Sequence, residues 1–306
     1  MIKHEINFVS KDGKSKMRAI IREPEGAAKG ILQIVHGMAE YIDRYEDFMQ
    51  YLCGQGWICC GHDHLGHGKL AKQEDLGYFA DRDGWKLLIE DTHQVTKLMQ
   101  SRHPEQPYVL MGHSMGSFVA RLTAVKYKED YKGLIICGTG GRNRLDGLGV
   151  LLFDTIRFFR GSRHRSRFVD STMAKFFNRG FAQDRNINWI SRDREQVDRY
   201  FEDPLCGFGF TASAMGDLVR LTRSANGREW FRSFPKNLPT FIISGTHDPV
   251  GDYGKGVTSV YNNLLKNGAS RVSMTLYPEG RHEILNEINK EEVYEDVAHF
   301  LSKNFG

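Results

Sequence analysis

A serine between two glycines is the residue of this sequence best placed to act as a nucleophile. Gly112-His-Ser114-Met-Gly116 follows an apolar run over 108–111 and precedes helical spacing over 117–127. A sharp turn from strand to helix needs small residues at both glycine positions, and it lifts the serine hydroxyl clear of the sheet edge. The helix start also offers free N–H groups and a positive dipole end. The pattern predicts Ser114 as a nucleophile, although a plain glycine-rich turn would look similar.

An acid and a base follow the serine along the chain. A serine hydroxyl is a weak nucleophile until a histidine takes its proton and a carboxylate orients that histidine. Asp248 comes directly after a predicted strand over 240–244, and His282 follows another over 272–277. Side chains past the carboxyl ends of parallel strands meet at one edge of the sheet. We therefore predict Asp248 as the acid and His282 as the base. The alternatives are that Asp248 only opens an Asp-Pro turn and that His282 is a histidine of a surface loop.

Other histidines compete for a role, because the sequence contains 12. His113 lies inside the turn, and we expect its ring to point along the turn and away from Ser114. His62, Asp63, His64 and His67 form a glycine-flanked cluster that would suit a metal ion. The glycines favour the alternative, a tight loop whose histidines bond to the backbone. We expect no metal and no organic cofactor.

Strands and helices alternate on both sides of these residues. A hairpin is predicted over 4–22, buried strands over 30–35, 57–60, 107–111 and 133–137, and helices over 43–55, 85–99 and 117–127. After a long interruption the alternation returns with strands over 240–244 and 272–277 and helices over 253–267 and 291–304. This order predicts an α/β fold with a mostly parallel sheet, which helices flank.

The interruption, residues 141–235, is predicted to be a helical cap inserted between two sheet strands. It holds 17 Lys and Arg against 11 Asp and Glu, whereas the rest of the chain holds 25 against 27. We therefore assign 1–140 and 236–306 to the core and 141–235 to the cap. The excess positive charge of the molecule sits in the cap.

Composition excludes several classes of protein. A formal charge of +4 over 306 residues is too small for a nucleic-acid binder. Five cysteines without a CxxC pair predict neither a disulfide framework nor a zinc site. No apolar stretch approaches the length of a signal peptide or a membrane span. These features predict a soluble, cytoplasmic protein, and they leave its oligomeric state open.

Beyond these single features, the chain resembles the monoacylglycerol lipase and lysophospholipase branch of the α/β-hydrolase superfamily, also called the serine aminopeptidase S33-like hydrolases. The resemblance covers most of the chain. Its matching segments are HGMAEY from His36, DHLGHG from Asp63, GHSMG from Gly112, GTHDPV from Gly245 and RHEILNE from Arg281, with WISRD and DPLC in the cap. It implies Ser114, Asp248 and His282 as the triad, and the backbone N–H groups of Met38 and Met115 as the oxyanion hole.

The sequence departs from the family pattern at two positions and is ambiguous at a third. Ser117 stands where a further glycine is usual, and Leu65 replaces a common arginine or proline. Both changes can reshape nearby loops without touching catalytic groups. Glu40 has two readings, a contact with a polar head group of the substrate or an ion pair with Arg44.

Three functions remain after these arguments. The first is hydrolysis of carboxylic esters, of the monoacylglycerol or lysophospholipid type, through an acyl-enzyme. The second is an S33-type aminopeptidase, which would need acidic groups to hold a substrate ammonium, whereas the cap is basic. The third is a non-catalytic binding protein on the same fold, against which the complete triad argues.

The cap also contains an apolar stretch beside an arginine cluster. Residues 148–159 are apolar over most of a helix, and Arg163, Arg165 and Arg167 follow. Such a pair could cover an acyl chain and bind anionic lipid surfaces or charged ester substrates. The alternative is an ordinary lid helix with solvated arginines and salt bridges to the cap's acids.

Overall fold

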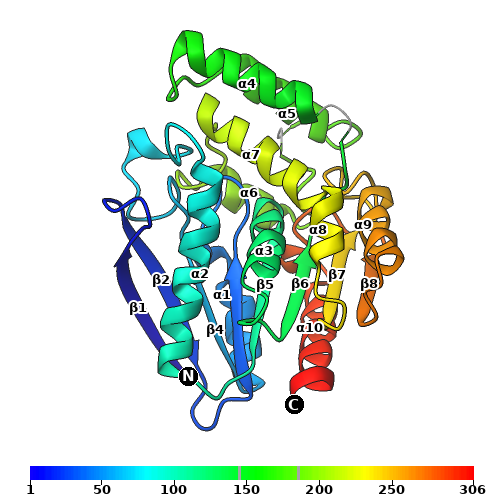
Figure 1. Ribbon diagram of the computed structural model, residues 1–306. Helices are drawn as coiled ribbons and strands as arrows, with labels where there is room; N and C mark the ends of the chain where they lie inside the picture. Colours follow the sequence, from blue (N-terminus) through cyan, green and yellow to red (C-terminus); the bar gives the residue numbers. More distant parts are fainter. Residues whose placement is uncertain (144–145, 185–186) are drawn as a thin grey trace.

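One eight-stranded sheet organises the molecule (Figure 1), whose computed structural model describes residues 1–143, 146–184 and 187–306. The strand order is β1-β2-β4-β3-β5-β6-β7-β8. The pairs β1–β2 and β2–β4 are antiparallel, and every other neighbouring pair is parallel. The strands are β1 (Ile2–Val9), β2 (Lys16–Glu23), β3 (Gly30–Val35), β4 (Trp57–His62), β5 (Tyr108–His113), β6 (Gly133–Cys137), β7 (Thr240–Gly245) and β8 (Val272–Tyr277). The predicted mostly parallel sheet is confirmed.

Burial explains the apolar runs that predicted the inner strands. Every residue of β3 to β7 is buried, because helices cover both faces of the sheet there. By contrast β1, at one edge, is exposed along most of its length. The strand β8 closes the other edge and is only partly buried.

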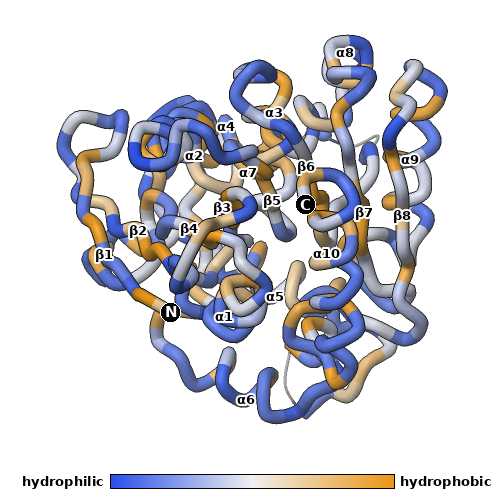
Figure 2. The backbone as a smooth tube through the Cα atoms, turned by 90° about the horizontal axis from the view of Figure 1, so that it is seen from below, coloured by the Kyte–Doolittle hydropathy of each residue, from blue (hydrophilic) through white to orange (hydrophobic). Residues whose placement is uncertain are grey.

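Two helical layers sandwich the sheet. On one face α2 (Gly84–Arg102), α3 (Met115–Lys126) and α9 (Lys255–Lys266) pack into one apolar cluster, and on the other α1 (Glu46–Gly54) and α10 (Lys290–Phe305) pack into a second. Figure 2 shows α2, α3 and α9 on one side of the row of strands and α1 on the other. Short 3-10 turns complete the core: η1 (Ile42–Tyr45), η2 (Gln73–Asp75) and η3 (Ile284–Asn286).

A helical insertion lies between β6 and β7, as predicted. It contains α4 (Asp146–Arg160), α5 (Arg167–Phe177), α6 (Arg194–Glu202), α7 (Ala212–Ala225) and α8 (Arg228–Ser233). In Figure 1, α4 and α5 form the outermost layer and α7 lies beneath them. Leu221 of α7 and Trp230 of α8 are buried in the same cluster as α3. Because cap and core share this cluster, the division at 140/141 and 235/236 stays a prediction.

The loops that hold the predicted site residues all follow strands at one edge. Residues 36–40 follow β3, Ser114 follows β5, Asp248 follows β7 and His282 follows β8. Because these strands are parallel, their carboxyl ends lie together on the side where the insertion leaves β6. The cap therefore lies over the predicted site.

Helix length bears on membrane insertion. Within residues 1–143, 146–184 and 187–306, each helix is too short or too polar to span a bilayer.

Candidate active site

The turn between β5 and α3 holds Ser114 in a strained conformation, with φ 53° and ψ −121°. A Cβ on Gly112 would lie 2.2 Å from the carbonyl oxygen of Gly116, and one on Gly116 would lie 2.1 Å from that of Val35. Only glycine fits either position, so the two glycines permit the sharp turn that presents the serine. The N–H of Ser114 donates to the carbonyl of Cys137, 3.0 Å away, which ties the turn to β6.

Ser114, His282 and Asp248 form one hydrogen-bonded line. The Oγ of Ser114 lies 2.8 Å from Nε2 of His282, and Nδ1 of His282 lies 3.0 Å from Oδ1 of Asp248. A carboxylate beside Nδ1 places the ring proton there and leaves Nε2 free to accept the serine proton. The structure thus brings the three predicted residues into the geometry of a nucleophile, base and acid.

The base and the acid are both buried and held in place. Asp248 is inaccessible to solvent, and its carboxylate also accepts the N–H of Val250 at 2.9 Å and the hydroxyl of Ser244 at 3.2 Å. The ring centre of Trp189, a residue of the cap, lies 5.0 Å from that of His282. Phe177 packs on Trp189, and their ring centres are also 5.0 Å apart. Aromatic cover over the base restricts the approach of water and forms an apolar wall for a substrate.

The loop after β3, residues 36–40, lies against the nucleophile. A Cβ on Gly37 would come within 3.1 Å of the Ser114 Cβ. The N–H of Gly37 donates to Oε1 of Glu40 at 2.6 Å, and the N–H of Ala39 donates to Nε2 of His67 at 3.2 Å. The N–H of Met38 lies between these two hydrogen-bonded N–H groups along the chain. Among the described residues no acceptor is recorded for it, nor for that of Met115 at the start of α3. These are the two donors that the sequence predicted for an oxyanion hole.

Of the two readings of Glu40, its surroundings favour the ion pair with Arg44, and a contact with a substrate head group stays a proposal. Its carboxylate is buried, and it accepts the Gly37 N–H, the Tyr45 hydroxyl at 2.9 Å and an Arg44 N–H at 3.0 Å. The alternative, the ion pair with Arg44, is what the structure contains. Burial alone would raise the pKa of Glu40, but His113 and Arg44 hold it below its ordinary value.

The fold separates the members of the predicted arginine cluster, and the predicted role of Arg163 and Arg165 as substrate contacts stays a proposal. Arg163 pairs with Asp75 at 2.7 Å and lies 3.8 Å over the Tyr78 ring. Arg165 donates to the carbonyl oxygens of Gly209 and Leu76. Both side chains therefore bind the cap to the loop around η2. Arg167, at the first turn of α5, is exposed, and its role as a substrate contact also stays a proposal.

The histidine cluster is a buried group of rings in tilted and edge-to-face contact. The ring centre of His36 lies 4.3 Å from that of His64 and 5.2 Å from that of His67. The ring centres of His62 and His64 are 5.0 Å apart. Burial lowers the pKa of His62 and His67 to about 4 and that of His36 to about 3. Asp63 turns away, accepting the N–H of Ile42 at 3.0 Å. Within the part of the chain that the structure describes, no three such groups are arranged to hold a metal ion.

Sequence reasoning missed a set of buried charged groups beside the triad. Arg44 binds both oxygens of Glu283, at 2.7 and 2.6 Å, and His113 lies 3.2 Å from Glu40. His113 does point away from Ser114, as predicted, but it points at a carboxylate. Its position next to the nucleophile, and that of Glu283 next to the base, were the available signals.

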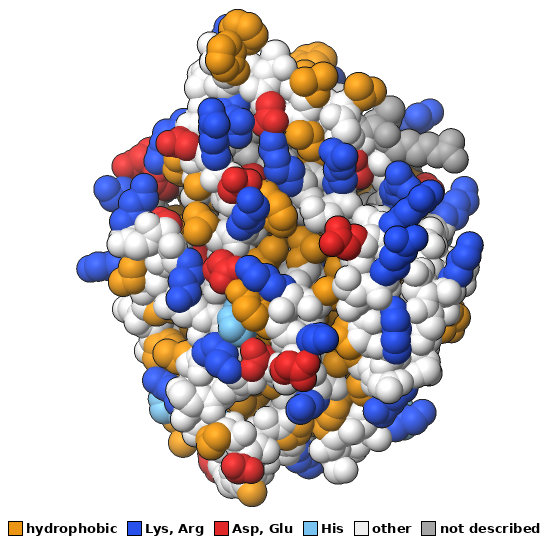
Figure 3. Space-filling view, in the orientation of Figure 1, with side chains coloured by type: hydrophobic (Ala, Val, Ile, Leu, Met, Phe, Trp, Pro, Cys, Tyr) orange, Lys and Arg blue, Asp and Glu red, His pale blue; other side chains and the backbone are white. Residues whose placement is uncertain are grey.

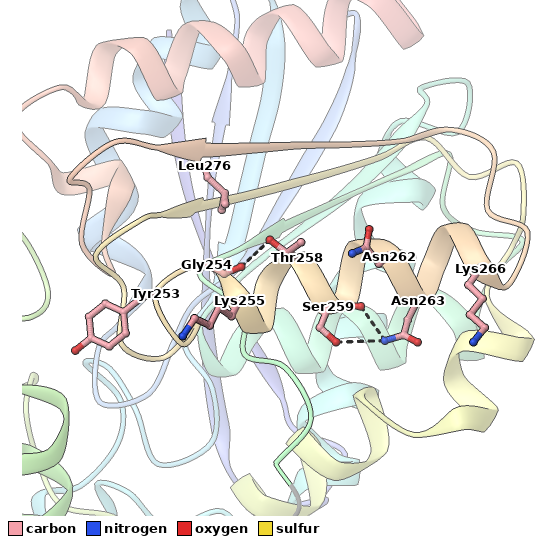
Figure 4. Close-up of a pocket in the computed structure, with 9 residues that line it drawn as sticks. All are labelled: Tyr253, Gly254, Lys255, Thr258, Ser259, Asn262, Asn263, Lys266 and Leu276. Carbon is pink, nitrogen blue, oxygen red and sulfur yellow. Dashed lines mark hydrogen bonds between the residues drawn. The ribbon is translucent and has the colours of Figure 1, made fainter.

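A separate open groove of about 590 Å³ runs along α9 beside the edge strand β8 (Figure 4). Tyr253, Lys255, Asn262, Lys266 and Leu276 are among its lining residues. Its lining includes no residue of the triad or the oxyanion loop, so the candidate active site remains the edge beneath the cap.

Comparisons with known proteins agree with this geometry. A profile of the family described as serine aminopeptidase, S33, matches residues 26–289. Monoglyceride lipase from Homo sapiens is 30% identical over 280 residues, which cover 87% of this chain and 83% of that protein.

Two solved structures are also similar to this chain. A thermostable carboxyl esterase from Bacillus coagulans, crystallised in complex with glycerol, matches with a TM-score of 0.93 and 31% identity over 100% of both chains. A soluble variant of monoglyceride lipase from Saccharomyces cerevisiae shares the fold, with a TM-score of 0.78 and 18% identity over 99% of this chain and 95% of that one. The family profile covers most of the sequence, and the fold is that of its relatives. The chain therefore belongs to the serine aminopeptidase S33 family of α/β-hydrolases, among relatives of the esterase and lipase type.

Proposed function

We propose that this protein hydrolyses carboxylic esters of the monoacylglycerol or lysophospholipid type through an acyl-enzyme on Ser114. The observation that carries the proposal is the continuous line from Ser114 Oγ through His282 to the buried carboxylate of Asp248. This line supplies an activated nucleophile without any metal or organic cofactor.

The reaction begins when Oγ of Ser114 attacks the ester carbonyl and Nε2 of His282 takes its proton. Asp248 stabilises the imidazolium that forms and keeps the ring in one tautomer. The N–H groups of Met38 and Met115 bind the tetrahedral oxyanion, and each such donor is worth roughly 3 kcal/mol. His282 then protonates the leaving alcohol and later activates the water that releases the acid.

The exposed apolar side chains of the cap support a lipid ester as substrate. We call them the cap patch: Leu148, Leu151, Leu152, Phe158, Phe159, Phe168 and Phe176, each between 52% and 81% exposed. Figure 3 shows apolar side chains at the top of the molecule, over α4, with lysines and arginines below. Exposed aromatic groups beside cationic ones are typical of surfaces that lie against lipid. A cap resting on lipid would receive an ester from the surface directly above the triad.

An aminopeptidase activity is less well supported. A peptidase of this kind needs a free anion near the nucleophile for the substrate ammonium. Glu40 and Glu283, beside the triad, are already paired with Arg44 and His113. The names of the relatives, monoglyceride lipase and carboxyl esterase, also favour an ester.

The test compares substrates that share one acyl chain. Purified protein receives monooleoylglycerol, oleoyl-lysophosphatidylcholine and leucine p-nitroanilide, with S114A as the control. We expect hydrolysis of at least one oleoyl ester and a loss of at least about 10⁴ in kcat in S114A. Cleavage of the anilide faster than both esters would replace this proposal by the peptidase.

A further inference from the structure

His113 bridges two loops of the active site. Its Nδ1 lies 3.2 Å from Oε1 of Glu40, and its Nε2 lies 3.2 Å from the carbonyl oxygen of His282. Glu40 belongs to the loop that carries the Met38 N–H, and His282 is the base. The side chain next to the nucleophile therefore connects the oxyanion loop to the loop of the base.

Both neighbours of the His113 ring are acceptors. A carboxylate oxygen and a carbonyl oxygen have no proton to give, so a hydrogen bond at either contact requires an N–H from the ring. A neutral imidazole has only one N–H, whereas an imidazolium has two. Both contacts are hydrogen bonds only when His113 carries a proton on each ring nitrogen.

The surrounding charges lead to the same conclusion. Glu40, Arg44, Glu283 and His113 form a buried quartet whose side chains are 4%, 10%, 5% and 5% exposed. With a charged His113 the quartet holds two positive and two negative groups. With a neutral ring it would hold one uncompensated negative charge away from water, which is costly.

The other titratable groups facing the quartet do not change this balance. In the part of the chain that the structure describes they are two thiols, two phenols and three imidazoles: Cys137, Cys206, Tyr45, Tyr200, His36, His67 and His282. Burial raises the pKa of the thiols and phenols and lowers that of His36 and His67, so these six stay neutral. His282 is the proposed base. The compensating positive charges therefore come from Arg44 and His113.

We propose that His113 is a positioning residue that acts as an imidazolium, holding the oxyanion loop and the catalytic base in register. Glu40 transmits the restraint to the loop, because the same oxygen that faces His113 accepts the N–H of Gly37. The inference rests on the proposed function, since it explains how that site is kept in its working geometry.

The inference has a pH signature. Burial alone would lower the pKa of His113, but the hydrogen bond and charge of Glu40 outweigh it, and the pKa lies above the ordinary 6.5. The raised pKa extends the charged form of the ring toward higher pH, and the ring loses one of its two bonds as pH rises through that pKa. We expect kcat/KM to fall on the alkaline side through a group separate from His282.

Two substitutions divide the bridge. In H113N the amide nitrogen stands near the place of Nδ1 and can donate to Glu40, whereas in H113Q it stands near the place of Nε2 and can donate to the His282 carbonyl. Both side chains are neutral at every pH. We expect either variant to lower kcat about 10- to 100-fold with little change in KM, and to lose the alkaline fall. H93Q is the matched control, because His93 pairs with Asp130 at 2.9 Å between α2 and the loop after α3. It should keep the pH profile of the parent.

A direct measurement needs no catalysis. In protein labelled with 15N-histidine, the ring signals that vanish in H113Q or H113N and persist in H93Q belong to His113. We expect their titration midpoint to lie above that of the exposed histidines. A midpoint at or below theirs, or an alkaline fall that survives in both variants, would overturn the inference.

The two proposals fail separately. Activity that persists in S114A contradicts the proposed function. If S114A is inactive and the His113 ring is neutral, the positioning role is contradicted and the proposed function is not.

Discussion

Gly37 lies so close to Ser114 that a Cβ on Gly37 would sit 3.1 Å from the Ser114 Cβ and 2.6 Å from Oε1 of Glu40. The oxyanion loop and the nucleophile therefore touch through a position without a side chain. Any side chain there must push the loop away from the serine or displace the Glu40 carboxylate.

We therefore expect Gly37→Ala to lower kcat by about 10²- to 10³-fold, the loss typical of a misplaced oxyanion donor. KM for a small ester should change little, because the acyl and alcohol contacts are intact. Steady-state kinetics with p-nitrophenyl butyrate measures both. Gly54→Ala is the control, since a Cβ there meets nothing within 4 Å. A kcat for Gly37→Ala equal to that of the control would refute the close-contact argument.

His62 should make the protein sensitive to acid. Burial lowers its pKa to about 4, against 6.5 in the unfolded chain, so unfolding takes up a proton between these two values. Its contribution to stability is complete above pH 6.5 and is lost as pH falls toward 4. At pH 5 the loss is about 2 kcal/mol.

His62→Leu removes this proton uptake and leaves the other titrating groups in place. Between pH 7.5 and pH 5, we expect the parent to lose about 2 kcal/mol more free energy of unfolding than the variant. Urea denaturation at the two pH values measures the difference. His299→Leu, on an exposed position of α10, serves as control and should follow the parent. Parallel losses in parent and His62→Leu would show that His62 does not titrate in this range.

The cap patch should bind lipid. Phe158 and Phe159 are 81% and 75% exposed at the end of α4. Changing both to Ser should weaken vesicle binding at least about tenfold, because two aromatic rings no longer enter the lipid. Hydrolysis of p-nitrophenyl butyrate should stay at the parent rate.

Leu265→Ser is the control for the cap patch, because Leu265 is 42% exposed on α9, outside the cap. Sedimentation with phosphatidylcholine–phosphatidylserine vesicles measures the binding. If the double variant and the control sediment equally, the cap patch does not contact lipid.

Arg165 should stabilise the cap. Its guanidinium binds carbonyl oxygens of Gly209 and Leu76, so Arg165→Gln leaves two part-buried acceptors unpaired. We expect a loss of about 1–2 kcal/mol in the free energy of unfolding. Arg167→Gln, two positions away and exposed, should cost less than about 0.5 kcal/mol. Equal unfolding curves for the two variants would contradict the assignment of Arg165 to the cap–core contact.

The sequence was sufficient for the sheet and for the loops that carry the triad. The runs that became β3, β5 and β7 are continuously apolar because both faces of these strands are buried. Once these strands are parallel, Ser114 and Asp248 must follow their carboxyl ends at the same edge. This is a local pattern combined with a topological rule, and both can be read from one sequence.

Contacts between distant segments could not be predicted in the same way. Arg163 finds Asp75 and Arg44 finds Glu283, partners separated by 88 and 239 positions. No periodicity links them, so the arginines looked free and Glu40 looked available to a substrate. Ser117 is another example: its hydroxyl donates to the carbonyl of Ser114 at 2.6 Å, which only the folded turn reveals.

The most direct test of the account is to identify the residue that becomes acylated or phosphonylated. The protein is treated with a fluorophosphonate probe and the labelled peptide is located by mass spectrometry, with S114A in parallel. The account predicts one adduct, on Ser114, and neither adduct nor ester hydrolysis in S114A. An adduct on another residue, or a variant that hydrolyses esters as fast as the parent, would contradict it.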